Sequence, residues 1–420
     1  MEVINDYVTN IIFEENNDSN NWGNIIAILD CKGIITKKIF IKYLNNIIKN
    51  NDILYKNIVK KNNNNFLEVN KVDIQQQYMY KKCNYKLFDK KTYYVLNKKY
   101  ETNWFFHLYT DYDNKKSRIY FTINHAYADG YKIISLLTTY NKQSQYKTPN
   151  FKRKNNNSYY IIIGTCILIF LYLKTLYNIY SKPSTNSINT NSINTNSINT
   201  NSINTNSTDF ISIDFNYNKL KSISKKNNIS LNDLLYSLTI KCHYHYFKTK
   251  QNILIASPFN TGNKNKTNNF FFLFTEIYNN LDTLNLFKKV NYIFNCYKFS
   301  AFVLIIGYIY NIIGNVICKQ IYNKITDNLD ILYTNMIGPE KKNFHDQYDN
   351  CILFNKKKIT IDNVSFVMNH KKKEMIFNII SYNNTINVVI SFPENIYNKK
   401  KLINAINCAY NDILFNDKNI

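Results

Sequence analysis

Arginine is nearly absent from the sequence, and glycine and proline are scarce. Only two of the 53 basic residues, Arg118 and Arg153, are arginine, and the 420 residues include 8 glycines and 5 prolines. Proteins that read nucleic acid favour arginine, because its guanidinium group forms paired hydrogen bonds with guanine and phosphate. We therefore expect no nucleic-acid partner despite a net charge of +24, and keep a basic nucleic-acid binder only as a rival. The bias toward Asn, Ile, Lys, Tyr and Phe is typical of an A/T-rich genome.

Patterns for metal binding and secretion are also missing. The eight cysteines are scattered, with no C-x-x-C pair and no zinc-like spacing. In the nearest cluster, Cys242-His243-Tyr244-His245, the side chains are one and two residues apart and do not converge on a helix. The N-terminus MEVINDYVTN does not resemble a signal peptide. We expect reduced thiols, no metal site and no bound cofactor.

Length and composition indicate a folded body of two or three domains. Hydrophobic residues make up 45% and charged residues 20%, which excludes a wholly disordered, collagen-like or coiled-coil protein. Helix-like and strand-like patterns alternate, with a helix predicted over 40–59. Strands are predicted at 117–125, 210–215, 252–259, 358–366, 375–381 and 385–392. The fold class is therefore α/β, in an N-terminal half (1–150) and a C-terminal half (209–420).

The segment between the halves has two parts. Residues 151–182 combine a basic flank, which includes Lys152 and Lys154, with the uncharged apolar run 159–173 and its tyrosine flanks. This length approaches the ~20 residues that span a bilayer, so we predict a membrane-associated helix, and a buried core helix is the alternative. The basic flank would place the N-terminal half in the cytosol. Residues 183–208 contain four N-S-I-N-T copies and read as a polar linker.

One motif carries chemistry. The strand RIYFTIN ends in His125-Ala126-Tyr127-Ala128-Asp129-Gly130, and the helical pattern YKIISLLTTY follows at once. The strand delivers His125 at its end, Asp129 can turn its carboxylate toward the loop backbone or the imidazole, and Gly130 supplies conformational freedom. A neutral imidazole held in one orientation can remove a proton from a hydroxyl group. A histidine at a strand end is otherwise an ordinary structural residue.

Several segments, in order along the chain, resemble the wax ester synthase/diacylglycerol acyltransferase family of the chloramphenicol-acetyltransferase-like H-H-x-x-x-D-G superfamily. NWFFHLY, with Trp104, is similar to the P-L-W-E-F-H-L segment of that family, and INHAYADGYKIISLL to its active-site motif. ISLNDLLYSLTIK resembles its T-x-N-D-x-x-L-A helix, and YTNMIGPE its S-N-V-P-G-P signature. The matching positions in the last two segments are Asn232, Asp233, Asn335, Gly338 and Pro339.

The resemblance implies two chloramphenicol-acetyltransferase-like subdomains that enclose a channel, with an inserted membrane-associated helix. It implies transfer of a long-chain acyl group from acyl-CoA to a fatty alcohol or diacylglycerol, with His125 as general base and Asp129 orienting its loop. Asn124 replaces the first histidine of the family motif. Membrane lipid is then a partner, and the endoplasmic reticulum or a lipid droplet is the expected location, with both halves facing the cytosol. Because both halves must form one channel, we expect a tilted or re-entrant anchor that does not separate them.

The second-half motif residues would shape the channel. Asn232 and Asp233 at a helix start, and the turn with Asn335, Gly338 and Pro339, are the tentative substrate-binding residues. Their alternative roles are a helix cap and a simple turn. Two other functions stay open: an inactive acyltransferase-like membrane scaffold, suggested by Asn124, and a condensation-type acyltransferase with another donor.

Overall fold

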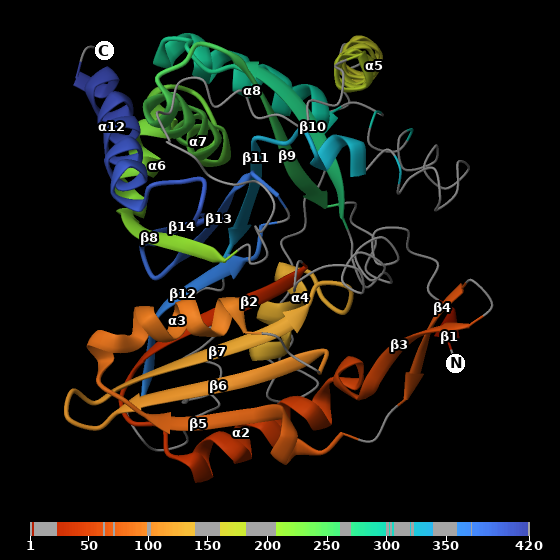
Figure 1. Cartoon of the computed structure of the whole chain (residues 1–420). Coiled ribbons are helices and arrows are strands. Elements are labelled where there is room, and N and C mark those ends of the chain that lie inside the picture. Colours follow the sequence, from red (N-terminus) through yellow and green to blue (C-terminus); the bar gives the residue numbers. More distant parts are fainter. Residues whose placement is uncertain are drawn as a thin grey trace, which may run out of the picture.

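The computed structural model describes residues 2–3, 23–61, 64–69, 72–98, 102–138, 160–181, 207–260, 270–299, 302, 305, 320, 323–338, 359–370 and 372–418. The predicted basic flank, nearly all of the N-S-I-N-T linker and Pro339 lie outside these residues. Two large sheets, each with its own helices, form two subdomains (Figure 1).

The N-terminal subdomain is built on a five-stranded sheet in the order β12-β2-β7-β6-β5. Parallel pairing joins β5 to β6, and the other neighbours are antiparallel. Its strands are β2 (Asn24–Lys32), β5 (Tyr78–Lys82), β6 (Trp104–Asp111), β7 (Lys116–Asn124) and β12 (Thr360–Met368). A second, small sheet contains β1 (Glu2–Val3), β3 (Lys56–Lys61) and β4 (Asn64–Val69).

The helices of this subdomain cover both faces of the large sheet. On β7, Ile119, Phe121 and Ile123 face the core cluster under α2 (Lys37–Asn50), whereas Tyr120 faces the cluster under α3 (Phe88–Asn97). This two-residue alternation is what the sequence pattern predicted. The remaining elements are α4 (Gly130–Thr138) and the short helices η1 (Asp52–Tyr55), η2 (Ile74–Gln77) and η3 (Tyr85–Leu87).

The helix predicted over 40–59 was too long. The α2 helix ends at Asn50, where the Asn51 side chain bonds back to the Ile47 carbonyl oxygen at 2.8 Å. Asparagine competes for backbone hydrogen bonds and so favours helix ends over helix interiors. The apolar residues that follow form η1 and then β3.

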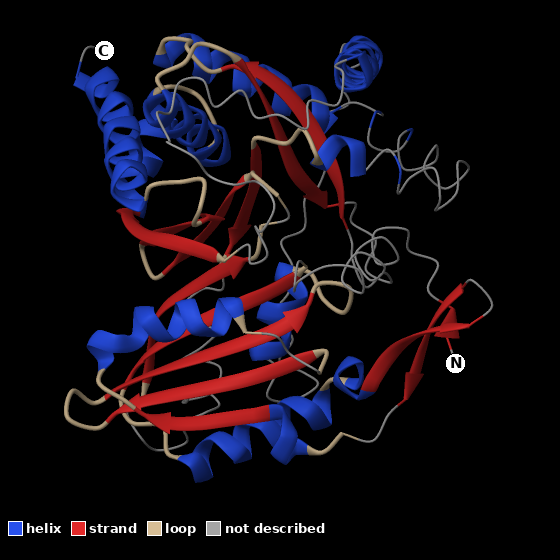
Figure 2. Cartoon of the chain, viewed as in Figure 1, coloured by secondary structure: helices blue, strands red, loops and turns tan. Residues whose placement is uncertain are grey.

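The C-terminal subdomain has a six-stranded mixed sheet in the order β10-β9-β11-β13-β14-β8 (Figure 2). Its strands are β8 (Thr208–Asn216), β9 (Asn252–Asn260), β10 (Phe270–Tyr278), β11 (Ile331–Ile337), β13 (Met375–Tyr382) and β14 (Thr385–Pro393). Its helices are α6 (Tyr217–Lys226), α7 (Leu231–Phe247), α8 (Thr283–Phe299) and α12 (Lys399–Lys418). All six strands predicted from alternation are present, within two residues of their predicted bounds.

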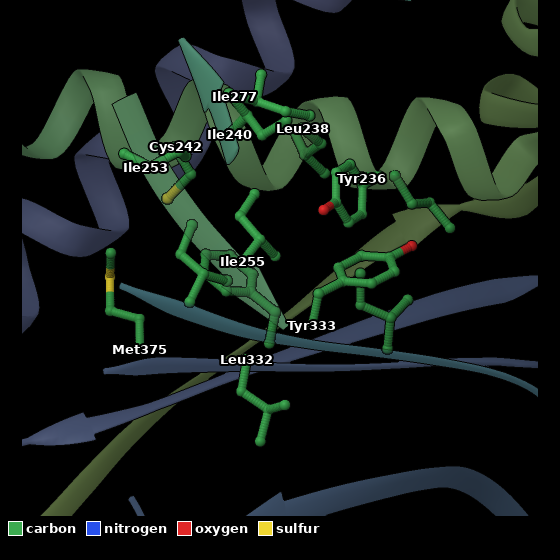
Figure 3. Close-up of a cluster of buried hydrophobic side chains, with 14 of the residues drawn as sticks. Tyr236, Leu238, Ile240, Cys242, Ile253, Ile255, Ile277, Leu332, Tyr333 and Met375 are labelled. Atoms are coloured by element: carbon green, nitrogen blue, oxygen red, sulfur yellow. The ribbon is translucent and has the colours of Figure 1, made fainter. Parts of the chain in front are cut away.

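The main core of this subdomain lies between α7 and the sheet. Tyr236, Leu238 and Ile240 from α7 meet Ile253 and Ile255 from β9 in one buried cluster, which Figure 3 shows from within the subdomain. Twelve of the seventeen α7 residues are buried, so α7 is a central helix. Burying an aliphatic or aromatic side chain contributes about 1.5–3 kcal/mol, and this cluster therefore fixes α7 on the sheet.

One strand joins the two subdomains. Although β12 follows most of the C-terminal subdomain in sequence, it pairs with β2 along the edge of the N-terminal sheet. Its side chains Val364 and Phe366 enter the N-terminal core, and Val367 enters the cluster that also holds Phe210 of β8 and Val389 of β14. The two halves of the sequence thus share a sheet and a core.

The predicted membrane segment forms the π-helical turn η4 (Tyr160–Gly164) and the helix α5 (Thr165–Ser181). Within the described part of the chain, no helix combines the length and the apolar character needed to cross a bilayer. Leu168 and Tyr172 of α5 instead join the core of the C-terminal subdomain, beside β10 and α8, so the alternative of a packed helix holds for one face of α5.

Candidate active site

His125 follows directly after the last residue of β7. This strand lies between β2 and β6, and Asn124 pairs with Asn24 in the register of β2. The backbone N–H of His125 donates to the carbonyl oxygen of Gly23 at 2.6 Å, and the side chain is largely buried. The Nδ1 atom is fully buried.

The turn after His125 is braced by Asn124 and Tyr127. The Asn124 Oδ1 atom accepts from the backbone N–H of Ala126 at 2.9 Å, and its backbone oxygen accepts from the N–H of Tyr127 at 2.9 Å. This is the local side-chain geometry of an Asx turn. The Tyr127 hydroxyl accepts from the N–H of Ile58 on β3 at 2.6 Å. Asn124 therefore shapes the loop that carries His125.

Asp129 caps the helix α4. Its Oδ1 atom accepts from the backbone N–H of Lys132 at 2.8 Å, and its backbone oxygen accepts from Ile133 at 2.9 Å. An acidic side chain at this position satisfies an N–H group that the helix itself leaves without a carbonyl. The sequence left two contacts open for the Asp129 carboxylate, one with the backbone and one with the His125 imidazole. The structure shows the contact with the backbone.

The first turn of α4 lies against β11 of the other subdomain. A Cβ atom on Gly130 would come within 2.1 Å of Sδ of Met336, so glycine allows this close approach. The next residue, Tyr131, accepts a hydrogen bond from the backbone N–H of Ile337, while burial raises the pKa of its hydroxyl. These contacts set the His125 loop against the end of β11. Sequence reasoning stopped at Gly130 and missed both Tyr131 and Met336.

Asn335 and Asn232 are in direct contact. The Asn335 Nδ2 atom donates to Oδ1 of Asn232 at 2.8 Å, and the Tyr333 hydroxyl donates to the same oxygen at 3.0 Å. The contact joins β11 to the N-terminus of α7. Two residues that the sequence proposed separately thus belong to one hydrogen-bonded cluster, on the strand whose end faces α4.

Asp233 has the structural role that the sequence left open. Its carboxylate accepts from the Ser230 backbone N–H at 2.9 Å and from Nδ2 of Asn291 at 2.8 Å. The Ser230 hydroxyl accepts in return from the Asp233 N–H at 3.1 Å, which completes a capping box. The side chain is buried, so Asp233 fixes the start of α7.

Gly338 allows the end of β11 to approach β13. A Cβ atom there would lie 2.0 Å from the backbone oxygen of Ser381, and backbone cannot move aside as a flexible side chain can.

Trp104 is buried in the N-terminal core, where its Nε1 atom donates to the Leu54 carbonyl oxygen at 3.1 Å. Trp104 thus supports β6, the neighbour of β7. A channel between the halves stays a prediction.

No family model matches the chain, and no curated protein matches its sequence. Solved structures match over nearly the whole length. The wax ester synthase/diacylglycerol acyltransferase of Marinobacter aquaeolei VT8 is 9% identical with a TM-score of 0.59, over 99% of both chains. The trichothecene 15-O-acetyltransferase of Fusarium sporotrichioides is 8% identical with a TM-score of 0.65, over 98% of this chain and 94% of that one.

A third solved structure has a bound acyl donor. It is a double mutant of the starter condensation domain of rhizomide synthetase in complex with C8-CoA and Leu-SNAC. It is 8% identical, with a TM-score of 0.57, over 99% of this chain and 93% of that one. Together these likenesses confirm the predicted fold of two α/β subdomains, the fold of the acyltransferase family that the sequence resembles.

Proposed function

We propose that this chain, which has the fold of these acyltransferases, is a membrane-associated O-acyltransferase. It would transfer a long-chain acyl group from acyl-CoA to a fatty alcohol or a diacylglycerol and form a wax ester or a triacylglycerol. The observation that carries the proposal is the placement of His125. It stands at the end of a central strand, in a loop braced by Asn124 and Asp129, and that loop packs on the strand of Asn335.

The reaction would use His125 as a general base. The Nε2 atom takes the proton of the acceptor hydroxyl while the hydroxyl oxygen attacks the thioester carbonyl. The tetrahedral oxyanion then collapses, the carbon–sulfur bond breaks, and the coenzyme A thiolate takes the proton back from His125. Asp129 contributes by positioning, because its carboxylate caps α4. Acyl-CoA is a co-substrate, and the chemistry requires no further cofactor.

The donor is proposed from two observations. The related fold of the starter condensation domain holds C8-CoA, and the net charge of +24 on this chain suits a donor that carries several phosphate charges. The fatty acceptor and the location at the cytosolic face of the endoplasmic reticulum or at a lipid droplet follow from the resemblance in sequence.

The test is ester formation by membranes that carry the protein, supplied with labelled palmitoyl-CoA and either a fatty alcohol or a diacylglycerol. His125→Ala should abolish the product. His245→Gln is the matched control, because His245 bonds to Asp412 between α7 and α12 at 2.8 Å, away from the His125 loop. Ester formation that persists in His125→Ala would overturn the proposed role of His125.

A second candidate is an inactive membrane scaffold with the same fold. The observation in its favour is Asn124, whose side-chain oxygen is bonded to the Ala126 N–H where the family motif has its first histidine. Well-folded protein that forms no ester with any acceptor would favour this candidate. Activity with a carrier-protein thioester but not with acyl-CoA would instead indicate a condensation-type donor.

A further inference from the structure

The helix α5 has two apolar faces. One face is buried against the C-terminal subdomain through Thr165, Leu168, Tyr172 and Thr175. The opposite face consists of Ile163, Cys166, Phe170, Leu173, Tyr177 and Tyr180, which we call the outer stripe. These residues recur at intervals of three and four, the spacing that places side chains on one side of a helix. An ordinary surface helix has polar residues on this side.

The outer stripe is exposed to an unusual degree. Phe170 is 66% exposed, Leu173 58% and Tyr177 72%. Of the seventeen large hydrophobic side chains that are exposed in the described part of the chain, six lie in the short segment 160–181. Contiguous exposed apolar surface of this kind marks an interaction site in a soluble protein.

Contacts on the buried face fix the direction of the outer stripe. Leu168 is fully buried, and the Tyr172 ring meets the Phe302 ring edge-on, with centroids 5.9 Å apart. Near the end of the helix, Asn178 Nδ2 donates to Oε2 of Glu276 on β10 at 3.0 Å. Because these contacts hold α5 on β10 and α8, the helix cannot roll its outer stripe inward. Figure 1 shows α5 at the outer side of the C-terminal subdomain.

Charge and aromatic placement indicate what covers the stripe. Residues 160–181 include no acidic residue. Lys174 is exposed at the edge of the stripe, and Lys289 of α8 lies beside it across a small cavity. Tyr177 and Tyr180 end the stripe with rings that have one polar tip, as suits the boundary between lipid and water. Lysines beside an apolar stripe favour an anionic lipid surface over a second copy of the same basic chain.

We propose that the outer stripe docks the enzyme on a phospholipid membrane that contains anionic lipid, with α5 lying flat in the interface. The stripe from Ile163 to Tyr180 is about 26 Å long at the helical rise per residue, so its six side chains would enter one leaflet together. Both subdomains then stay on one side of the membrane. This inference rests on the proposed membrane location of the enzyme and names the residues that make the contact.

The first test is binding to vesicles by co-sedimentation, with phosphatidylcholine alone or with about one third phosphatidylserine. The variant Phe170→Ser/Leu173→Ser/Tyr177→Ser should lower the partition coefficient about a hundredfold or more, because three large side chains no longer enter the lipid. Lys174→Gln should lower binding about fivefold, and only on the anionic vesicles. The matched control is Val69→Ser/Ile396→Ser/Phe415→Ser, which removes three exposed apolar side chains elsewhere and should bind as the unmodified protein does.

The second test keeps the stripe intact. A polarity-sensitive fluorophore on Cys166, which is exposed and free, should shift to the blue when vesicles are added. The same labelling of the Cys166→Ser variant measures the background from other thiols. No shift at Cys166, or equal vesicle binding by both triple variants, would overturn the proposal. The proposal would also be overturned if the unmodified protein is a dimer that does not bind vesicles and the stripe variant is a monomer. The outer stripe would then be a dimer interface.

These measurements do not depend on catalysis. If the stripe binds vesicles and no ester forms, the docking surface stands and the acyltransferase proposal fails. If ester forms with a short-chain, water-soluble acceptor and the stripe does not bind vesicles, the acyltransferase proposal stands and the docking surface fails. The stripe variant should retain activity on such an acceptor, because none of its three residues belongs to the His125 site.

Discussion

Tyr131 of the N-terminal subdomain accepts a hydrogen bond from the backbone N–H of Ile337 in the C-terminal subdomain. The contact links the first turn of α4, which Asp129 caps, to the last residue of β11. Through it, the loop that holds His125 is positioned relative to the strand that holds Asn335.

Removing the Tyr131 hydroxyl should therefore affect activity more than stability. We expect Tyr131→Phe to lower the free energy of unfolding by about 1 kcal/mol, the usual value of one hydrogen bond. Ester formation should fall about tenfold, because a small displacement of a general base costs much of its rate. Urea unfolding and initial rates on the same preparation measure both. Unchanged rates would show that the contact does not position His125.

Asn124 should act through the turn that it braces. Asn124→Ala removes the oxygen that accepts from the Ala126 N–H, and we expect a loss of about 1 kcal/mol in stability together with lower activity. Asn124→Asp keeps an acceptor at the same place and serves as the control. Equal behaviour of the two variants in thermal unfolding and in the ester assay would argue against the turn as the function of Asn124.

Two glycines should differ in their tolerance of a methyl group. In Gly338→Ala the new Cβ meets the backbone oxygen of Ser381, and in Gly130→Ala it meets the flexible Met336 side chain. We expect Gly338→Ala to destabilise the protein by about 3 kcal/mol and Gly130→Ala by about 1 kcal/mol or less. Urea unfolding midpoints measure both variants, provided that the dependence of the unfolding free energy on urea concentration is the same. A larger loss of stability in Gly130→Ala than in Gly338→Ala would contradict the prediction.

His107 should make the protein less stable in acid. Burial lowers the pKa of His107 from 6.5 to about 3, with Lys98 and Lys81 adding to the effect. Between these values the unfolded chain binds a proton that the folded chain does not, so stability falls as the pH drops below 6.5. At pH 5 the loss relative to neutral pH should be about 2 kcal/mol.

The variant His107→Phe should remove that part of the pH dependence. His245→Gln is again the control, since His245 is bonded to Asp412 near the surface of the C-terminal subdomain. Urea unfolding of both variants at pH 5 and pH 7 measures the difference. A pH slope that is the same in His107→Phe and in the unmodified protein would rule out His107 as its source.

The sequence predicted those parts of the fold that depend on local pattern. Six strands that alternate apolar and polar residues, as Ile119 to Asn124 do in β7, were predicted because the side-chain period of a strand is two. These strands are β7, β8, β9, β12, β13 and β14. The end of α2 was not predicted. The helix ends at Asn50, but Ile53 and Leu54 continue the apolar pattern of the helix beyond that residue. The packing of Leu168 and Tyr172 against the C-terminal subdomain could not be predicted from the segment 159–180, because apolar content alone does not separate a membrane helix from a helix with one buried face.

Non-local contacts could not be read from the sequence. His125 and Asp129 stood out through their spacing, whereas the Tyr131–Ile337 contact joins residues about two hundred positions apart with no shared pattern. The same holds for β12, whose apolar residues fit a strand in either sheet. The roles of Asn232 and Asp233 were both open at the sequence level. The hydrogen bonds in the structure show that Asp233 caps α7 and that Asn232 contacts Asn335 of β11.

The pairing of β12 with the N-terminal sheet has a consequence for synthesis. The edge of β2 stays open until residues 360–368 leave the ribosome, long after β7 and α4 are made. At about 5–20 residues per second, this delay lasts roughly ten to fifty seconds. During that time a nascent chain exposes an unpaired strand edge, which invites pairing with other chains. An N-terminal half expressed as a separate chain would lack β12 and leave the edge of β2 unpaired, whereas the C-terminal half contains all six strands of its own sheet.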